Sequence, residues 1–219
     1  MREQISVTGM VLMAAPVGEY DRRLVILTCG RGKITAFARG VRRPGNQLMA
    51  AAAPFVFGKF LLYEGRDAYT LAGAEVENYF REIAGDMEAA CYGSYFLEMA
   101  DYYGRENIDA TETLRLLYQS LRALLKPSVP NRLVKPVYEL KLMEINGEYR
   151  ELPLGRLNDS TLYAWQYVLA APVESLYTFT LTDQVLGEFV RCVEQNKERF
   201  IDKTFHSLDI LNAVMDNAT

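Results

Sequence analysis

Cysteine, histidine and long apolar runs are all scarce in this chain of 219 residues. Its three cysteines, Cys29, Cys91 and Cys192, are far apart and odd in number, which excludes a C-x-x-C motif and a framework of paired disulfides. We therefore expect reduced, mostly buried thiols. The longest apolar run, residues 49–56, is far below the ~20 residues that cross a bilayer, so no membrane-spanning helix is expected.

A secretory signal is also missing from the N-terminus, because alternating residues follow the first few positions without an apolar core or a small-residue cleavage site. This predicts a cytoplasmic protein. Hydrophobic residues make up 50% of the chain and charged residues 24%, a balance typical of a globular protein with a substantial core. The length fits one large unit or two small domains, and we favour two.

Residue groups that carry catalysis or bind metals are not found either. The single histidine, His206, lies in a predicted helical region with no Cys/His cluster near it, and a lone histidine is usually structural. The stretch Gly30-Arg31-Gly32-Lys33 is too short for a phosphate-binding loop and is better explained as a hairpin turn. The carboxylates show no spacing that singles out an acid/base pair. We expect no enzymatic activity, metal or cofactor.

The first seventy-odd residues alternate as strands do. Gly30 and Gly32 allow the positive φ angles of a tight hairpin, residues 40–46 form a loop, and the alanine-rich residues 48–53 predict a short helix stopped by Pro54. Five short strands with a small helix before the fourth are consistent with a β-barrel of the OB type, although an SH3-like barrel also fits. The predicted strands are residues 5–13, 22–28, 33–39, 55–63 and 66–71.

After about residue 75 the apolar period changes to three or four residues, which predicts amphipathic helices. Asp109 and Glu112 resemble a capping box, Gly147 ends a helix, and Pro136 sits either in a first turn or at a kink. The fold class is α+β, with a barrel domain over residues 1–76 and a helical domain over residues 77–219. The predicted helical stretches are residues 87–102, 114–125, 131–147, 160–170, 182–200 and 206–214.

Positive charge is concentrated in the predicted barrel although the chain has a net charge of -4. Lys33 and Arg39 share a strand face if the register is unbroken, with Thr35 and Phe37 between them unless Phe37 belongs to the core. A solvated barrel surface is the alternative explanation, but a run of cations without an acid favours binding of a polyanion such as nucleic acid. Loop arginines can also reach phosphates or stack on bases. The seven cations are Arg22, Arg23, Arg31, Lys33, Arg39, Arg42 and Arg43.

Several stretches resemble the RecO family of bacterial DNA repair and recombination mediators. Three of them are specific in order and spacing: Gly9–Leu12, Gly18–Arg22 and Leu27–Pro44. Weaker helical similarities follow at Phe96–Met99, Tyr138–Leu142 and Phe205–Leu208. The resemblance spans nearly the whole chain and is looser in the helical half.

The resemblance implies an OB-fold joined to a helical domain, without catalytic turnover, in a nucleoid-associated protein of the bacterial cytoplasm. Such proteins bind single- and double-stranded DNA, anneal complementary strands, and work with RecR to load RecA onto DNA coated by single-stranded DNA-binding protein. The family's DNA surface includes the basic barrel residues named above. Many members carry a four-cysteine zinc module, but residues 147–160 hold no cysteine here, so zinc is not expected.

The family's helical domain also docks the acidic, apolar tail of single-stranded DNA-binding protein. Arg115, Arg122 and Lys126 are spaced to fall on one helical face, which suits such a tail, although a solvated face explains them too. An alternative function is a protein-interaction adaptor whose barrel arginines pair with an acidic protein partner. An enzyme with an unrecognised site is disfavoured for want of a nucleophile and base.

Overall fold

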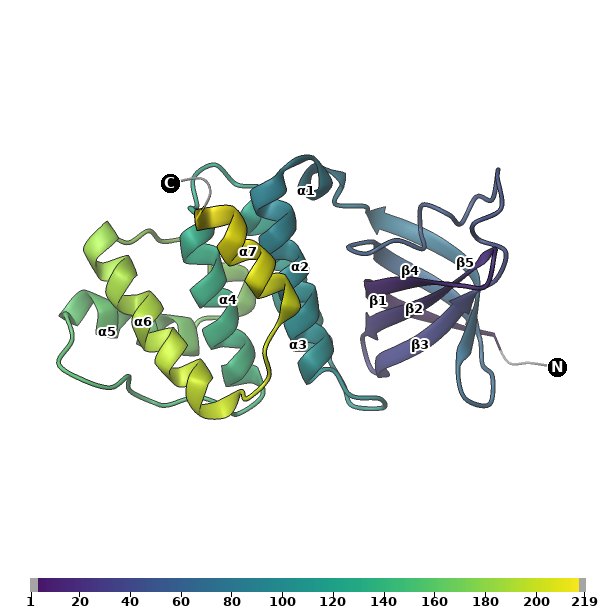
Figure 1. The fold of residues 1–219 in the computed structure, drawn as a ribbon. Helices are drawn as coiled ribbons and strands as arrows, with labels where there is room; N and C mark the ends of the chain where they lie inside the picture. Colours follow the sequence, from purple (N-terminus) through teal and green to yellow (C-terminus); the bar gives the residue numbers. More distant parts are fainter. Residues whose placement is uncertain (1–3, 217–219) are drawn as a thin grey trace. The chain divides into compact units, whose positions relative to one another are not determined.

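The computed structural model describes residues 4–216 and has an N-terminal sheet followed by helices (Figure 1). Five strands close into a barrel in the order β1-β2-β3-β5-β4, and the β3–β5 pairing is parallel while the others are antiparallel. The predicted α+β class with an OB-type barrel is confirmed. The strands are β1 (Gln4–Val17), β2 (Asp21–Thr28), β3 (Gly32–Ala38), β4 (Phe57–Tyr63) and β5 (Tyr69–Asn78).

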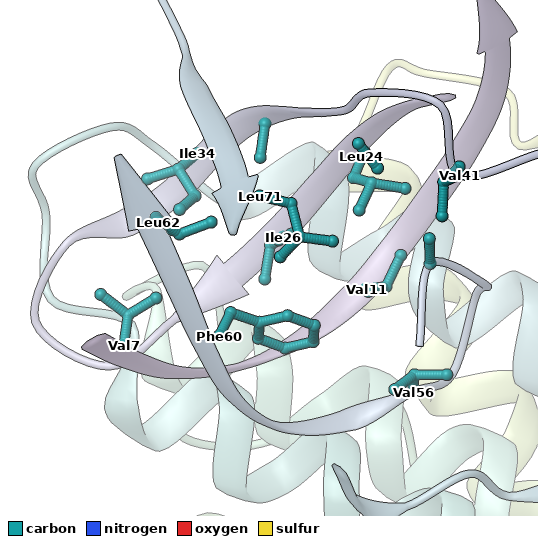
Figure 2. Packing of buried hydrophobic residues seen from close by; sticks show 13 residues of the cluster. Val7, Val11, Leu24, Ile26, Ile34, Val41, Val56, Phe60, Leu62 and Leu71 are labelled. Atoms are coloured by element: carbon teal, nitrogen blue, oxygen red, sulfur yellow. The ribbon is translucent and has the colours of Figure 1, made fainter. Parts of the chain in front are cut away.

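The barrel interior is filled by aliphatic side chains around one aromatic ring, Phe60, which is fully buried (Figure 2). Strand β3 shows why the sequence alternates: Ile34 and Ala36 point into this cluster, while Thr35 and Phe37 on the opposite face are only partly buried. Phe37 is therefore not part of the interior cluster. Lys33, Thr35 and Phe37 share the predicted face, because the register of β2 and β3 is unbroken. Arg39, which was predicted to share this face, lies in the turn after the end of β3 at Ala38.

Two strands extend beyond their predicted ends. β1 continues through Pro16 to Val17, with a register shift between Val11 and Met13 in its pairing with β2. β5 continues past Leu71 to Asn78, where Ala and Gly residues have little strand propensity of their own. Pairing with β4 stabilises this part of β5, because Phe60 of the barrel interior lies opposite Ala74.

The predicted helix over residues 48–53 is wrong, since these residues form turns. One helical-type bond, from Ala52 N to Leu48 O at 3.0 Å, is present. The side chain of Arg22 bonds to two other carbonyl groups of this segment: its Nη1 donates to the backbone oxygens of Ala52 at 2.8 Å and Met49 at 3.4 Å. A contact from Arg22 of β2 therefore overrides the helical preference of the alanines.

The helices confirm all six predicted helical stretches and add a short one, α1, before them, as well as the 3₁₀ turn Val173–Ser175. Pro136 is inside α4, which starts at Asn131, so its first-turn alternative is wrong. Gly147 ends this stretch with a φ of 75°. The helices are α1 (Arg81–Gly85), α2 (Met87–Tyr103), α3 (Thr111–Leu124), α4 (Asn131–Ile145), α5 (Asp159–Ala170), α6 (Asp183–Phe200) and α7 (His206–Asp216).

The chain forms two compact units, and the barrel unit contains more than the strands. It includes Leu97–Leu114, the end of α2 and the connection to α3, while the helical unit comprises Glu82–Phe96 and the residues from Arg115 onward. Backbone bonds hold this segment on the β2–β3 turn: Lys33 N donates to Arg105 O and Asn107 N donates to Arg31 O, both at 3.0 Å. The boundary between residues 76 and 77 stays a prediction.

Gly32 is required at this contact. Its φ is +66°, and a Cβ there would collide with the carbonyl oxygens of Arg105 and Ile108. Beside it, the carboxylate of Asp109 accepts hydrogen bonds from Gly30 N at 3.0 Å and from the backbone N–H and hydroxyl of Thr111 at 3.2 and 2.6 Å. Asp109 thus caps α3, as predicted, while also holding the strand turn; the reciprocal role of Glu112 stays a prediction.

Candidate nucleic-acid interface

The β2–β3 hairpin distributes the predicted cations between its two ends. Arg22 lies opposite Ala38 at the end where β2 starts, whereas Lys33 lies opposite Leu27 beside the turn. At about 3.4 Å per residue, Lys33 and Ala38 are ~17 Å apart along β3, and Arg39 follows Ala38. Arg31 and Lys33 therefore sit near the turn, and the other five predicted residues gather at the opposite end.

The two cations near the turn are paired with carboxylates. Lys33 Nζ lies 3.1 Å from Asp101 Oδ1 and donates to the Asp101 backbone oxygen at 2.6 Å. Arg31 Nη1 lies 3.5 Å from Glu64 Oε1 and donates to the Tyr69 hydroxyl at 3.2 Å. Each of these two cations therefore has an acidic partner within the barrel unit.

The outer face of the hairpin near the turn is also covered by the chain itself. Leu27 points away from the interior cluster and yet is fully buried. A Cβ on Gly104 would lie 3.3 Å from Leu27 Cδ1 and 3.1 Å from Lys33 Cβ, so the end of α2 packs on this face. A ligand can therefore reach the hairpin at its other end.

Four exposed cations gather at that other end, and we call them the basic end: Arg23, Arg39, Arg42 and Arg43. Arg22 is beside them but half-buried, and its guanidinium holds the 49–52 turn. Two acids are close in sequence: Glu19 is exposed, and Asp21 Oδ1 accepts a hydrogen bond from Gly40 N at 2.7 Å. Cations thus outnumber acids here, and one of the acids is engaged by the backbone.

The loop that carries Arg42 and Arg43 is held in place by hydrogen bonds. Arg42 N donates to Tyr20 O at 2.9 Å, Arg43 N donates to Gly40 O at 3.1 Å, and Asn46 Nδ2 donates to Gly40 O at 3.0 Å. The Arg43 guanidinium lies over the Tyr20 ring, 5.1 Å from its centroid. The backbone of the loop is therefore anchored to itself and to the β1–β2 turn.

Sequence reasoning did not select Tyr20 as a site residue. An exposed tyrosine in a turn has no local signal that separates it from ordinary surface, and its partner Arg43 is far along the chain. Two signals were available: its place in the Gly18–Arg22 stretch of family resemblance, and its place in the β1–β2 connection, which OB-folds commonly use to bind oligonucleotides.

The residues predicted to bind a partner's tail lie in the helical unit. Arg115 and Arg122 are exposed on α3, but Lys126 lies beyond the last residue of that helix, Leu124, so its predicted place on the helix face is wrong. Pro127 follows it, and the residue before a proline disfavours helical backbone. Lys126 instead lines a cavity of about 490 Å³ with three acids, Glu82, Asp86 and Glu88. An acidic tail is not favoured there.

Other predicted features are placed as follows. Cys192 is buried, but Cys29 and Cys91 are only partly so, which corrects the expectation of mostly buried thiols. His206 is the first residue of α7. Within residues 4–216, no group of three or more His, Cys, Asp or Glu side chains is placed to hold a metal ion. No helix among these residues has the length and apolar character to cross a membrane.

A closed OB-type barrel with a basic end, followed by a helical unit, defines a class of barrel proteins with a cationic surface suited to polyanions. Two family models match the chain: "Recombination protein O N terminal" over residues 1–80 and "Recombination protein O C terminal" over residues 84–152. The chain belongs to the RecO family of DNA repair and recombination proteins. The resemblance read from the sequence motifs is confirmed.

Individual relatives support the same family assignment. A DNA repair protein RecO of Acetivibrio thermocellus is 23% identical, over 96% of this chain and 97% of the relative. Proteins of the same name from Alkaliphilus metalliredigens and Desulforudis audaxviator are 34% and 33% identical, over 65% and 68% of this chain. Those two alignments cover 58% and 59% of the relatives, so the stronger similarity is confined to part of their length.

Proposed function

We propose that this chain is a non-enzymatic recombination mediator that binds single- and double-stranded DNA through the basic end of its barrel. It promotes strand annealing and, with RecR, helps load RecA onto DNA coated by single-stranded DNA-binding protein, in association with the nucleoid. The observation that carries the proposal is the group of four exposed cations on one end of the barrel, two of them on a hydrogen-bonded loop. Membership of the RecO family supports it.

The physical basis is release of counterions from DNA. Each cation that replaces a condensed counterion on single-stranded DNA adds about -0.7 to the slope of log K against log salt. Four phosphate contacts at the basic end then give a slope of roughly -3. Arg31 and Lys33 add little, because Glu64 and Asp101 already compensate them.

The test is a titration of a labelled single-stranded oligonucleotide at several salt concentrations. We expect the variant Arg39→Ala/Arg42→Ala/Arg43→Ala to bind more weakly and to reduce the slope by about 2. The matched control Arg31→Ala/Lys33→Ala removes cations from the same hairpin and should leave the slope nearly unchanged. Wild-type affinity in the triple variant would place the DNA site elsewhere on the chain.

Partner binding needs a separate test. We propose that Arg115 and Arg122 contact the carboxylates of the tail of single-stranded DNA-binding protein, with Lys126 at most peripheral because of its acidic neighbours. A labelled tail peptide should bind wild type and lose affinity with Arg115→Ala/Arg122→Ala. Pull-down with RecR, with and without oligonucleotide, distinguishes the mediator from an adaptor, since a pure adaptor would not bind DNA.

A further inference from the structure

We infer that Tyr20 is a base-stacking residue, which makes the basic end favour single-stranded over double-stranded DNA. The inference rests on the proposed DNA-binding function and adds the kind of DNA that the site selects. Tyr20 lies in the turn between β1 and β2. It is 38% exposed although the Arg43 guanidinium lies over its ring, so aromatic surface remains open to solvent beside the cations.

The ring is held where a ligand on the basic end would meet it. The backbone oxygen of Tyr20 accepts the hydrogen bond from Arg42 N, which joins its turn to the loop of Arg42 and Arg43. Arg42 Nη1 also reaches the oxygen of Gly18 in the same turn, at 3.5 Å. A phosphate bound by these arginines would therefore bring its own nucleotide close to the Tyr20 ring.

One exposed apolar side chain lies at the end of the strand that leads into the turn of Tyr20. Val17, at the end of β1, is 39% exposed and lies opposite Asp21, at the other side of the turn that contains Tyr20. Apolar surface next to phosphate-binding cations suits a nucleotide whose base is unpaired, because the base buries its faces against the protein. Phosphates of a duplex can reach the same arginines, but the faces of paired bases are already stacked on their neighbours.

Stacking on an aromatic residue tolerates any sequence and contributes roughly 1–3 kcal/mol per base, or about 5- to 150-fold in affinity. The phosphate contacts act on both forms of DNA. The aromatic contact is thus the part of this surface that discriminates between them.

The experiment compares single-stranded and duplex oligonucleotides of equal length, at one salt concentration, for four proteins. Tyr20→Ala should weaken single-strand binding by about 5-fold or more and change duplex binding by less than about 2-fold. Tyr20→Phe keeps the ring and should retain wild-type selectivity. Tyr63→Ala removes a tyrosine of matching exposure, 39%, on β4, and should change neither affinity.

The outcomes separate this inference from the proposed function. If Tyr20→Ala leaves single-strand affinity unchanged, or weakens both substrates equally, the stacking role is overturned while the arginine triple variant still tests DNA binding. If Tyr20→Phe loses selectivity as Tyr20→Ala does, the hydroxyl and not the ring is responsible, and stacking is again overturned. A wild-type protein that binds neither substrate overturns both proposals. Unfolding midpoints equal to wild type establish that the variants are folded.

Discussion

Glu139 of α4 lies at the centre of a buried network of charged and hydroxyl groups in the helical unit. It is fully buried and accepts hydrogen bonds from Tyr95 Oη at 2.6 Å and Lys197 Nζ at 2.9 Å, with Lys135 Nζ 3.0 Å away. Both lysines also contact Glu194 at 2.6 Å. Burial, and next the charge of Glu139, raise the pKa of the Tyr95 hydroxyl, so it stays a donor. A buried carboxylate is tolerated only with partners of this kind.

Removing this carboxylate should therefore cost more than removing an outer one. We expect Glu139→Ala to lower the free energy of unfolding by about 3–5 kcal/mol, because it leaves buried lysine charge uncompensated. Glu64→Ala breaks the exposed pair with Arg31, whose side chains are 44% and 39% exposed, and should cost about 1 kcal/mol or less. Urea unfolding of both variants measures the difference, and equal costs would contradict the assigned role.

The same network gives stability a defined dependence on acid. Burial alone would raise the pKa of Glu194, but the charges of Lys135 and Lys197 outweigh it and hold that pKa below its usual value. A carboxyl whose pKa is depressed on folding contributes stability above its unfolded pKa, about 4.3, and loses it as the pH falls through the folded pKa. We expect Glu194→Gln to show a smaller fall in unfolding free energy below about pH 4.5 than wild type does. Parallel curves would contradict this.

At the scale of the element, periodic patterns in the sequence found the six longer helices and the strand alternation, but not the short helix α1. Leu114, Leu117 and Leu121 recur along α3 and are all buried. Patterns failed at residues 48–53 because a distant group decides the outcome there, where Arg22 donates to the backbone oxygen of Ala52. The wrong placement of Lys126 has a local cause, because α3 ends at Leu124 and Pro127 follows Lys126. The candidate site shows the same limit. The sequence identified its cations, but Asp101, which compensates Lys33, is 68 positions away along the chain.

The burial of the leucines along α3 can be tested at one position. Leu121 is fully buried, so Leu121→Ala should lower the free energy of unfolding by about 2–5 kcal/mol through lost burial and the cavity left behind. Arg122→Ala, at the exposed neighbouring position, should change it by about 0.5 kcal/mol or less. Chemical denaturation of the pair gives the comparison; a cost below about 1 kcal/mol for Leu121→Ala would mean that the side chain is not buried in solution.

At the scale of the whole molecule, contacts and sequence order divide the chain differently. The segment Leu97–Leu114 belongs to the barrel unit although residues of the helical unit separate it from the strands. Asp109 is one anchor of this segment. The Thr111 hydroxyl, then the backbone N–H groups of Gly30 and Thr111, lower the pKa of its carboxyl, which remains ionised and accepting at neutral pH.

Replacing Asp109 should loosen this attachment locally. We expect Asp109→Ala to speed hydrogen exchange at the amides of Gly30 and Thr111, which lose their acceptor. The amide of Ile201, bonded to Lys197 O in the helical unit, serves as the internal reference and should exchange as in wild type. Acidification of wild type should have the same effect once the pH falls through the lowered pKa of Asp109. Uniform acceleration across the chain would instead indicate global destabilisation.

The Gly32 contact also limits how members of this family can exchange parts. Consider a chimera that takes its barrel strands from one relative and every later residue from another. Its β2–β3 turn would contact a loop at positions 105–109 that comes from the other relative. Leu27 would then lose the packing of the segment around Gly104, and Lys33 would lose the carboxylate of Asp101. Grafts should keep function only when the strands and residues 97–114 are inherited together, because the two segments pack as one module.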